Sequence, residues 1–215
     1  KRAIIIGASS GIGRQVAQLL IQDGWHVGLA ARRRERLEEL ARIDEERVKT
    51  IEMDVNTKEA TNRLQTLISQ VGGMNLFFYA AGIGKQNPML EENIELDTVE
   101  TNAMGFTRMV GEAFRYFAER AGGHIAVISS IAGTKGLGPA PSYSATKAMQ
   151  NCYLQALDQL AQQRKLNICF TDIRPGFVDT ELLFPEKMTE NKPETSTYPM
   201  LRSAQKGAKL IVKAI

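Results

Sequence analysis

The chain has 215 residues, of which 43% are hydrophobic and 24% are charged, and its formal net charge is +3. This is the composition of one ordinary folded domain with a substantial core, and it excludes a disordered or fibrous chain. Basic and acidic side chains are interleaved, which disfavours a nucleic-acid partner. The sequence has no apolar run near the ~20 residues of a membrane-spanning helix and opens directly in a strand pattern. We therefore expect a cytoplasmic protein without a membrane partner.

Six short apolar runs predict strands, at residues 3–6, 27–31, 48–53, 76–80, 124–129 and 167–173. Most are apolar throughout, as are strands that lie in a parallel sheet covered by helices. The connections between them are long enough for crossover helices, and no linker or repeat interrupts the pattern. The sequence therefore predicts a single α/β domain over residues 1–215, with a doubly wound, Rossmann-like parallel sheet and helices on both faces.

Helical spacing of apolar residues predicts helices at 13–23, 34–42, 101–121, 143–163 and 204–215. The predicted stripe of the 101–121 helix consists of Phe106, Met109, Val110, Ala113, Phe114 and Phe117. That of the 143–163 helix consists of Met149, Cys152, Tyr153, Ala156, Leu157 and Leu160. Cys152 and Cys169 lack metal-ligand spacing, so we interpret both as small core residues of a protein in a reducing compartment and expect no metal site.

The polar segment 181–199 contains three prolines and little periodicity. Long irregular connections in compact domains are usually functional or mobile, so we predict a lid over a substrate site. A disordered surface loop is the alternative, and it is compatible with a lid. The last helical pattern reaches the end of the chain without a stop signal, and no methionine starts the chain. We expect a trimmed version of a longer protein.

A glycine-rich turn, Gly7-Ala8-Ser9-Ser10-Gly11-Ile12-Gly13, follows the first predicted strand and opens the first helix. Glycines allow a tight turn and let backbone N–H groups approach a pyrophosphate, whose charge the helix N-terminus favours. The GxxxGxG spacing differs from the commonest dinucleotide fingerprint, and a purely structural turn is the alternative. Its position after the first strand favours phosphate binding.

Arginines end the second predicted strand, where an acidic residue would bind the free ribose 2'-hydroxyl of NAD. The residues present are Arg32, Arg33 and Arg34. A guanidinium suits a 2'-phosphate because its planar fork makes charge-assisted bidentate bonds. NADP is therefore favoured over NAD, with Arg32 the stronger candidate and Arg33 the second. The alternative is that these arginines pair with glutamates of the next helix, which explains Arg34 but not the missing acid.

Tyr143 and Lys147 lie one helical turn apart on the same face of a predicted helix. A lysine cation close to a phenol stabilises the phenolate and lowers the tyrosine pKa from about 10. Such a pair can provide a catalytic acid, although the same spacing is common on solvated helix faces. The rest of the chain decides between the two interpretations.

The GxxxGxG turn together with Tyr143-x-x-x-Lys147 resembles the short-chain dehydrogenase/reductase family, from residue 1 to about residue 180. Asp54 and Val55 follow the third strand, where the family holds the adenine ring. Asn102 lies in Thr-Asn-Ala-Met-Gly, which resembles the family's helix signature. Several further motifs follow in the family's order.

Ser130 precedes Tyr143 by the thirteen residues typical of the family's catalytic serine. The segment from Arg174 to Thr180 resembles the family's nicotinamide-contacting Pro-Gly motif, with Pro175, Gly176, Val178 and Thr180 as expected cofactor contacts. One motif differs from the family's usual sequence, because Tyr79-Ala80-Ala81-Gly82 stands where the family usually has Asn-Asn-Ala-Gly. Ala80, Ala81 and Gly82 still permit close approach to a cofactor, so we expect a modest effect on stability or cofactor affinity.

The resemblance implies an NADP(H)-dependent oxidoreductase that acts on a carbonyl or alcohol group. Tyr143 would be the general acid or base, Ser130 would bind the substrate oxygen, and Lys147 would lower the Tyr143 pKa and hold the nicotinamide ribose. Asn102 would support a water in a proton relay. The alternatives are an NADP-binding sensor or scaffold with little catalysis and an NAD-linked alcohol dehydrogenase.

The substrate is a small molecule whose identity the sequence does not give. Expected lining residues besides the lid are Gly84, Lys85, Ile131 and Pro139, with Met89, Met188 and Met200 as adaptable contacts. The helices at 101–121 and 143–163 resemble those through which family members pair. Leu154 lies off the predicted apolar stripe, so we expect a homodimer or homotetramer.

Overall fold

A six-stranded parallel sheet forms the centre of the protein, in a computed structural model that describes residues 1–182 and 202–215. The strands run in the order β3-β2-β1-β4-β5-β6. Their bounds are β1 Arg2–Ile6, β2 His26–Ala31, β3 Val48–Glu52, β4 Leu76–Tyr79, β5 Gly123–Ile128 and β6 Ile168–Ile173. The predicted doubly wound fold is confirmed. Strand order reverses between β1 and β4, and ligands of such sheets bind at the carboxyl ends of the strands beside this switch point.

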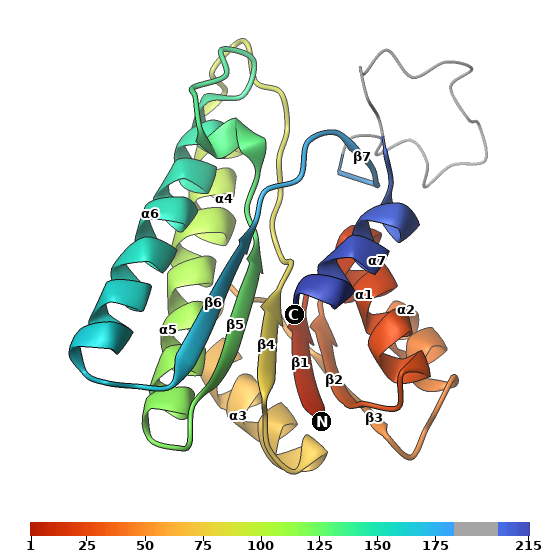
Figure 1. The fold of residues 1–215 in the computed structure, drawn as a ribbon. Coiled ribbons are helices and arrows are strands. Elements are labelled where there is room, and N and C mark those ends of the chain that lie inside the picture. Colours follow the sequence, from red (N-terminus) through yellow and green to blue (C-terminus); the bar gives the residue numbers. More distant parts are fainter. Residues whose placement is uncertain (183–201) are drawn as a thin grey trace.

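Helices cover both faces of the sheet (Figure 1). One face carries α1 (Gly11–Gln22), α2 (Arg34–Ala41) and α7 (Ala204–Ala214). The other carries α3 (Ala60–Val71), α5 (Phe106–Ala118) and α6 (Pro141–Gln163), and α4 (Glu92–Val99) packs against α6. The sequence analysis did not predict α3 and α4. The short strands β7 (Val178–Asp179) and β8 (Arg202–Ser203) pair in parallel, and α7 follows β8 directly.

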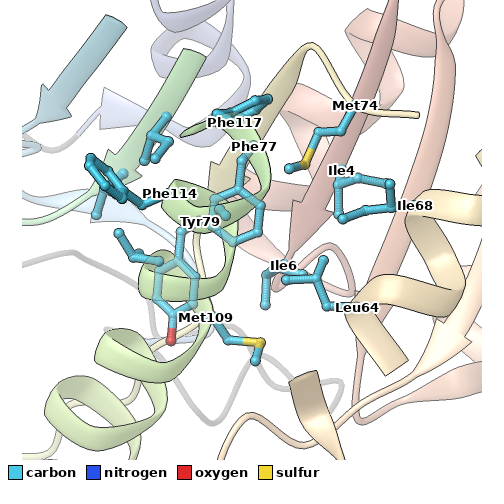
Figure 2. Packing of buried hydrophobic residues seen from close by; sticks show 14 of the residues in the cluster. Ile4, Ile6, Leu64, Ile68, Met74, Phe77, Tyr79, Met109, Phe114 and Phe117 are labelled. Carbon is cyan, nitrogen blue, oxygen red and sulfur yellow. The ribbon is translucent and has the colours of Figure 1, made fainter. Parts of the chain in front are cut away.

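The two cores follow from side-chain alternation along buried strands. Phe77 and Tyr79 of β4 point into the core under α3, α5 and α6, whereas Leu76 and Phe78 point into the core under α1, α2 and α7. Figure 2 shows the first of these cores, in which aromatic rings from β4 and α5 meet aliphatic side chains from β1 and α3. The sheet is therefore buried on both sides, as the apolar strand runs predicted.

The predicted 101–121 helix has its expected buried stripe but not its expected start. All six predicted apolar residues are buried. Residues Glu100–Gly105 form a π-helical turn, and the regular helix α5 ends at Ala118. π turns are uncommon and are often found at functional sites. Asn102, the predicted catalytic residue, lies within this turn.

The stripe predicted for the 143–163 helix is half right, because Leu157 is buried and Met149 and Tyr153 pack against the core. Cys152, Ala156 and Leu160 are exposed, and Leu154, which we expected to lie off the stripe, is 3% exposed. Cys169 is exposed as well, so neither cysteine is a core residue. The first half of α6 instead buries polar side chains, namely Ser142, Ser144, Thr146, Lys147, Gln150 and Asn151. A buried polar face needs internal partners, and those partners form the site described next.

The predicted lid lies almost wholly outside the described residues. Of the segment 181–199, only Glu181 and Leu182 are described, and Met188 and Met200 also fall outside. The described helices include none that is long and apolar enough to cross a membrane.

Candidate active site

The glycine-rich turn joins β1 to α1 at the switch point of the sheet. Gly7 has φ +89°, which L side chains rarely adopt, and a Cβ added there would lie 2.6 Å from the Ala81 backbone N. Gly7 N–H donates to Ala30 O at 2.8 Å, which ties the turn to β2. The chain after β4 can therefore approach the turn closely. Ser9, Ser10, Gly11 and Ile12 border the space left above the strand ends.

A cavity of about 490 Å³ opens at these carboxyl ends, within the size range of small-molecule sites. Its lining includes most of the predicted cofactor-binding residues: Gly7, Ser9, Ser10, Gly11, Ile12, Gly13, Arg32, Arg33, Asp54, Val55, Ala80, Ala81, Gly82 and Thr180. Met53, Thr101 and Ile128 also line it and were not predicted, and Glu181 and Leu182 line it from the start of the segment predicted as a lid. Backbone N–H groups at a helix start, a basic end and an apolar middle suit a dinucleotide.

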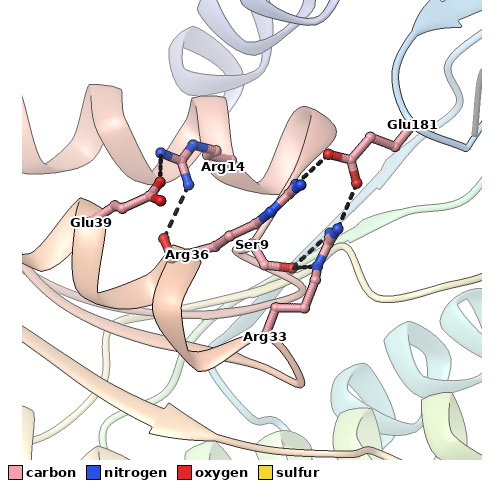
Figure 3. A network of polar contacts seen from close by, with 6 residues as sticks. All are labelled: Ser9, Arg14, Arg33, Arg36, Glu39 and Glu181. Atoms are coloured by element: carbon pink, nitrogen blue, oxygen red, sulfur yellow. Dashed lines mark hydrogen bonds and ion pairs between the residues drawn. The ribbon is translucent and has the colours of Figure 1, made fainter. Parts of the chain in front are cut away.

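The basic end of the cavity contains a cluster of two arginines around one carboxylate (Figure 3). Arg33 donates to Ser9 Oγ from Nη2 at 3.1 Å and to Glu181 Oε2 from Nη1 at 2.7 Å. Arg36 donates to the other Glu181 oxygen. Partial burial raises the pKa of the Glu181 carboxyl, but the hydrogen bonds from Arg36 and Arg33 outweigh it and hold that pKa below its usual value. This cluster is an anion site occupied by a carboxylate of the chain itself.

The remaining arginines at the end of β2 lie outside that cluster. Arg32 lines the cavity with an exposed side chain. Arg34 pairs with Glu38 at 2.7 Å along the exposed face of α2, as the alternative interpretation in the sequence analysis held for this residue. Arg36 was missed, and Glu181 was predicted only as part of the lid and not as a partner of these arginines. Glu181 is 148 residues from Arg33 in the chain, so no local pattern could have paired them.

Ser130 and Tyr143 lie next to each other and share a hydrogen bond. Ser130 follows β5 and caps the 3-10 turn Ile131–Gly133 by accepting from Ala132 N at 3.0 Å. Tyr143 lies in the first turn of α6, and its ring packs so closely on Gly84 that a Cβ there would lie 2.7 Å away. Burial raises the pKa of the Tyr143 phenol, and a hydrogen bond with Ser130 lowers it in part. At neutral pH the phenol therefore keeps its proton.

Lys147 lies below Tyr143 and is 5% exposed. Its Nζ donates to Ile128 O at 3.0 Å and to Gln150 Oε1 at 3.0 Å. Burial lowers the pKa of Lys147 to about 8, against an opposing effect of the Asp172 carboxylate. The Nζ atom lies 5.8 Å from the centre of the Tyr143 ring. The expected lowering of the Tyr143 pKa by Lys147 is not found, because burial of the phenol dominates.

Asn102 closes the site from the π turn. Its side chain accepts from Ile83 N at 2.9 Å and donates to Ile83 O at 2.7 Å, and it is fully buried. A Cβ on Gly82 would lie 3.2 Å from Asn102 Oδ1 and 3.7 Å from Lys147 Nζ. Asn102, Tyr143 and Lys147 thus converge on the loop that follows β4, and Ser130 lies beside Tyr143.

Two further residues predicted for the site, Pro175 and Met89, differ in their surroundings. Pro175 O accepts from Ile131 N at 3.1 Å, which places the Pro-Gly segment beside the serine turn. Met89 is 81% exposed. The described residues contain no group of three or more His, Cys, Asp or Glu side chains placed to hold a metal ion.

The strand order and the glycine-rich turn place the chain in the class of Rossmann-like α/β domains. A family model described as short chain dehydrogenase matches residues 1–191, and the chain belongs to this family. It is therefore a short-chain oxidoreductase.

Curated relatives support this assignment. An oxidoreductase of Staphylococcus aureus (strain USA300), named as uncharacterised, is 31% identical over 196 residues, which cover 89% of this chain and 84% of the relative. One of Myxococcus xanthus, named in the same way, is 32% identical over an alignment of 224 positions, which covers 100% of this chain and 83% of the relative.

Solved structures show the same fold at lower identity. A serine dehydrogenase complexed with NADP+ has a TM-score of 0.85 and 22% identity, with 99% of this chain and 88% of that chain covered. An actinorhodin polyketide ketoreductase variant with NADPH has a TM-score of 0.83 and 24% identity, with 99% of this chain and 89% of that chain covered.

Proposed function

We propose that this oxidoreductase uses NADP(H) to reduce a carbonyl group, or to oxidise the corresponding alcohol, with Tyr143 as the acid or base. The observation that supports the cofactor choice most directly is the pair Arg33 and Arg36 around the Glu181 carboxylate, with Arg33 also bonded to Ser9. A site that holds one anion with charge-assisted bonds suits the 2'-phosphate of NADP. The NADP-bound neighbours agree with this choice.

The bound cofactor would supply the hydride, and the chain would hold it along the cavity. The glycine-rich turn at the start of α1 would bind the pyrophosphate, and Arg33, with Arg32 beside it, would bind the 2'-phosphate. Asp54 and Val55 after β3 line the part expected to hold the adenine. The proposed cofactor contacts therefore run from the basic end of the cavity to Lys147.

The chemistry follows from the protonation states of the site. Tyr143 is a neutral phenol at neutral pH, so it can donate a proton to the oxygen of a carbonyl being reduced. The Ser130 hydroxyl lies next to the phenol and would bind the same oxygen, which orients it and stabilises its developing charge. Lys147 would place a positive charge beside the phenolate that remains after proton transfer.

Cofactor choice is tested by the dissociation constants of NADPH and NADH, measured by fluorescence for the native chain and for Arg33→Ala and Arg34→Ala. We expect Arg33→Ala to weaken NADPH binding about ten-fold or more, with little effect on NADH. Arg34→Ala is the control, because its guanidinium pairs with Glu38 away from the cavity. A native chain that prefers NADH would overturn the NADP proposal and favour an NAD-linked alcohol dehydrogenase.

Catalysis is tested by NADPH consumption with a panel of aldehydes, ketones and keto acids. Turnover that disappears in Tyr143→Phe supports a reductase. Tight NADPH binding without turnover on any member of the panel would favour the sensor or scaffold.

A further inference from the structure

A buried glutamine, Gln150, links Lys147 to Asn102 by hydrogen bonds. Gln150 lies on α6 almost one turn beyond Lys147 and is 0% exposed. Its Oε1 accepts from Lys147 Nζ at 3.0 Å, and its Nε2 donates to the backbone carbonyl of Asn102 at 2.7 Å. The side chain thus links the catalytic helix to the π turn.

The orientation of this amide follows from the chemistry of its neighbours. An ammonium group has only donors, so it must face the Gln150 oxygen. A backbone carbonyl has only acceptors, so it must face the Gln150 NH₂ group. A flipped amide would place donor against donor and acceptor against acceptor, at the centre of a buried cluster where water cannot compensate. The amide is therefore held in one orientation.

Lys147 depends on this amide for one of its two acceptors among the described residues, the other being Ile128 O. The two acceptors use two of the three ammonium donors and fix the direction of the third. A buried ammonium retains its proton only as far as its surroundings stabilise the charge. Removing the Gln150 oxygen would leave Lys147 equally buried with one fewer acceptor.

The other groups around Lys147 supply little that could replace the glutamine. On its own helix the nearest titratable group is the Tyr143 phenol. Across the sheet, Asp172 of β6 contributes its negative charge, but its oxygens are bonded to Ser129 and Arg174. The π turn and the loop after β4 face Lys147 with Asn102 and Gly82, neither of which is charged.

We propose that Gln150 is a positioning residue that keeps Lys147 protonated and fixes its ammonium group beneath Tyr143. This inference deepens the proposed function and rests on it for the role of Lys147 in turnover. An amide that donates at one end and accepts at the other does not carry a proton from Lys147 to the Asn102 carbonyl. Proton return to Tyr143 therefore follows a path that does not pass through Gln150.

The experiment is an NMR titration of Lys147 in protein labelled with 13C at lysine Cε, assigned by its loss in Lys147→Met. Gln150→Leu should lower the Lys147 pKa by about one unit, because the acceptor is removed at nearly constant volume. Gln150→Glu retains an acceptor and adds a negative charge, so it should raise that pKa. Gln155→Leu, on the exposed side of the same helix, is the control and should leave it unchanged.

A Lys147 pKa that stays in place in Gln150→Leu, or that moves in the same direction in Gln150→Leu and Gln150→Glu, would overturn the inference. If Gln150→Leu does not fold, Gln150→Glu decides alone by the direction of its shift. The titration needs no cofactor or turnover, so it remains decisive even if the NADPH-dependent reductase proposal fails. Where turnover is found, the high-pH limb of kcat should move with the Lys147 pKa in each variant.

Discussion

Glu181 forms an ion pair with Arg33, with Glu181 Oε2 2.7 Å from Arg33 Nη1. Arg33 is also the residue that we propose to bind the cofactor phosphate. Cofactor binding must then exchange one anion for another on Arg33. Such an exchange reduces the observed affinity, because the ion pair and its hydrogen bonds are lost before the phosphate is bound. The partly exposed pair is a modest competitor rather than a block.

Glu181→Gln should therefore bind NADPH more tightly, by about three-fold to ten-fold, while NADH binding changes little. Calorimetry at low and moderate salt measures both constants. Glu39→Gln removes a carboxylate that pairs with Arg14 at the surface of α1 and α2, so it controls for the change in net charge. Equal effects of Glu181→Gln on the two cofactors would argue against competition at the 2'-phosphate site.

Tyr143→Phe should reduce kcat by at least about a hundred-fold and leave the NADPH dissociation constant nearly unchanged, because it removes only the transferable proton. Stopped-flow measurement of hydride transfer isolates the affected step. Tyr153→Phe is the matched control, since Tyr153 lies on the same helix with its ring against Phe106. A Tyr143→Phe variant that retains full activity would exclude Tyr143 as the acid.

Gly84→Ala should impair catalysis, because the added methyl group would clash with the Tyr143 ring. The added Cβ would lie 2.7 Å from the Tyr143 ring, so the ring or the loop must shift. We expect kcat to fall by about ten-fold or more with NADPH binding preserved, because a small misplacement of a catalytic group is costly. Gly138→Ala, where nothing lies within 4 Å of the new Cβ, should behave like the native chain. Native kcat in Gly84→Ala would show that the tyrosine position is not tightly constrained.

The hydroxyl of Tyr79 is buried and has no hydrogen-bond partner among the described residues. Its removal in Tyr79→Phe should stabilise the fold by about 1 kcal/mol, because the ring packing is kept and an unpaired polar group is lost. Urea unfolding measures the difference. Tyr116→Phe is the opposite case, since the Tyr116 hydroxyl accepts from Met74 N at 3.2 Å, and it should destabilise. A destabilised Tyr79→Phe would reveal an internal partner such as a bound water.

Stability should rise with pH above about 8 because of Lys147. Its pKa is about 8 in the folded chain against an ordinary value of 10.5, so between these values the unfolded chain binds more protons and a rise in pH favours folding. Tyr143 has a raised pKa and opposes this only above its ordinary value of 10.0. Urea unfolding of the native chain and Lys147→Met at about pH 7.5 and 9.5 should show a smaller pH effect in the variant. An identical pH effect in both would contradict the lowered pKa.

The fold could be predicted because each strand carries its own signal. Apolar runs such as those of β1, β2 and β4 mark strands buried on both faces, and this pattern does not depend on distant contacts. The four residues that we propose as catalytic were predicted from spacing and order through the resemblance to the family, and their roles stay predictions. The structure brings Asn102, Tyr143 and Lys147 around the loop after β4.

The errors in the sequence analysis concern residues whose surroundings come from elsewhere in the chain. We assigned the stripe of α6 from hydrophobicity, but its first half buries Gln150 and Lys147 against Asn102 and leaves Cys152 exposed. Periodicity cannot reveal a face that is buried through polar pairing. The pairing of Glu181 could not be found either, because its partners lie on α2 and at the end of β2.

Asn102 presents to Ile83 the same donor and acceptor that the backbone of a neighbouring strand would present. Regular pairing of β4 with β1 ends at Tyr79 and Ile6, so the side chain of a helical residue takes the place of a strand just beyond the sheet. Asn102, 19 residues further along the chain, thus fixes the path of the loop after β4 by bonding the backbone of Ile83. A change that displaces the Asn102 side chain should therefore loosen this loop, and with it the pocket around the phenol, while the pairing of β4 with β1 is kept.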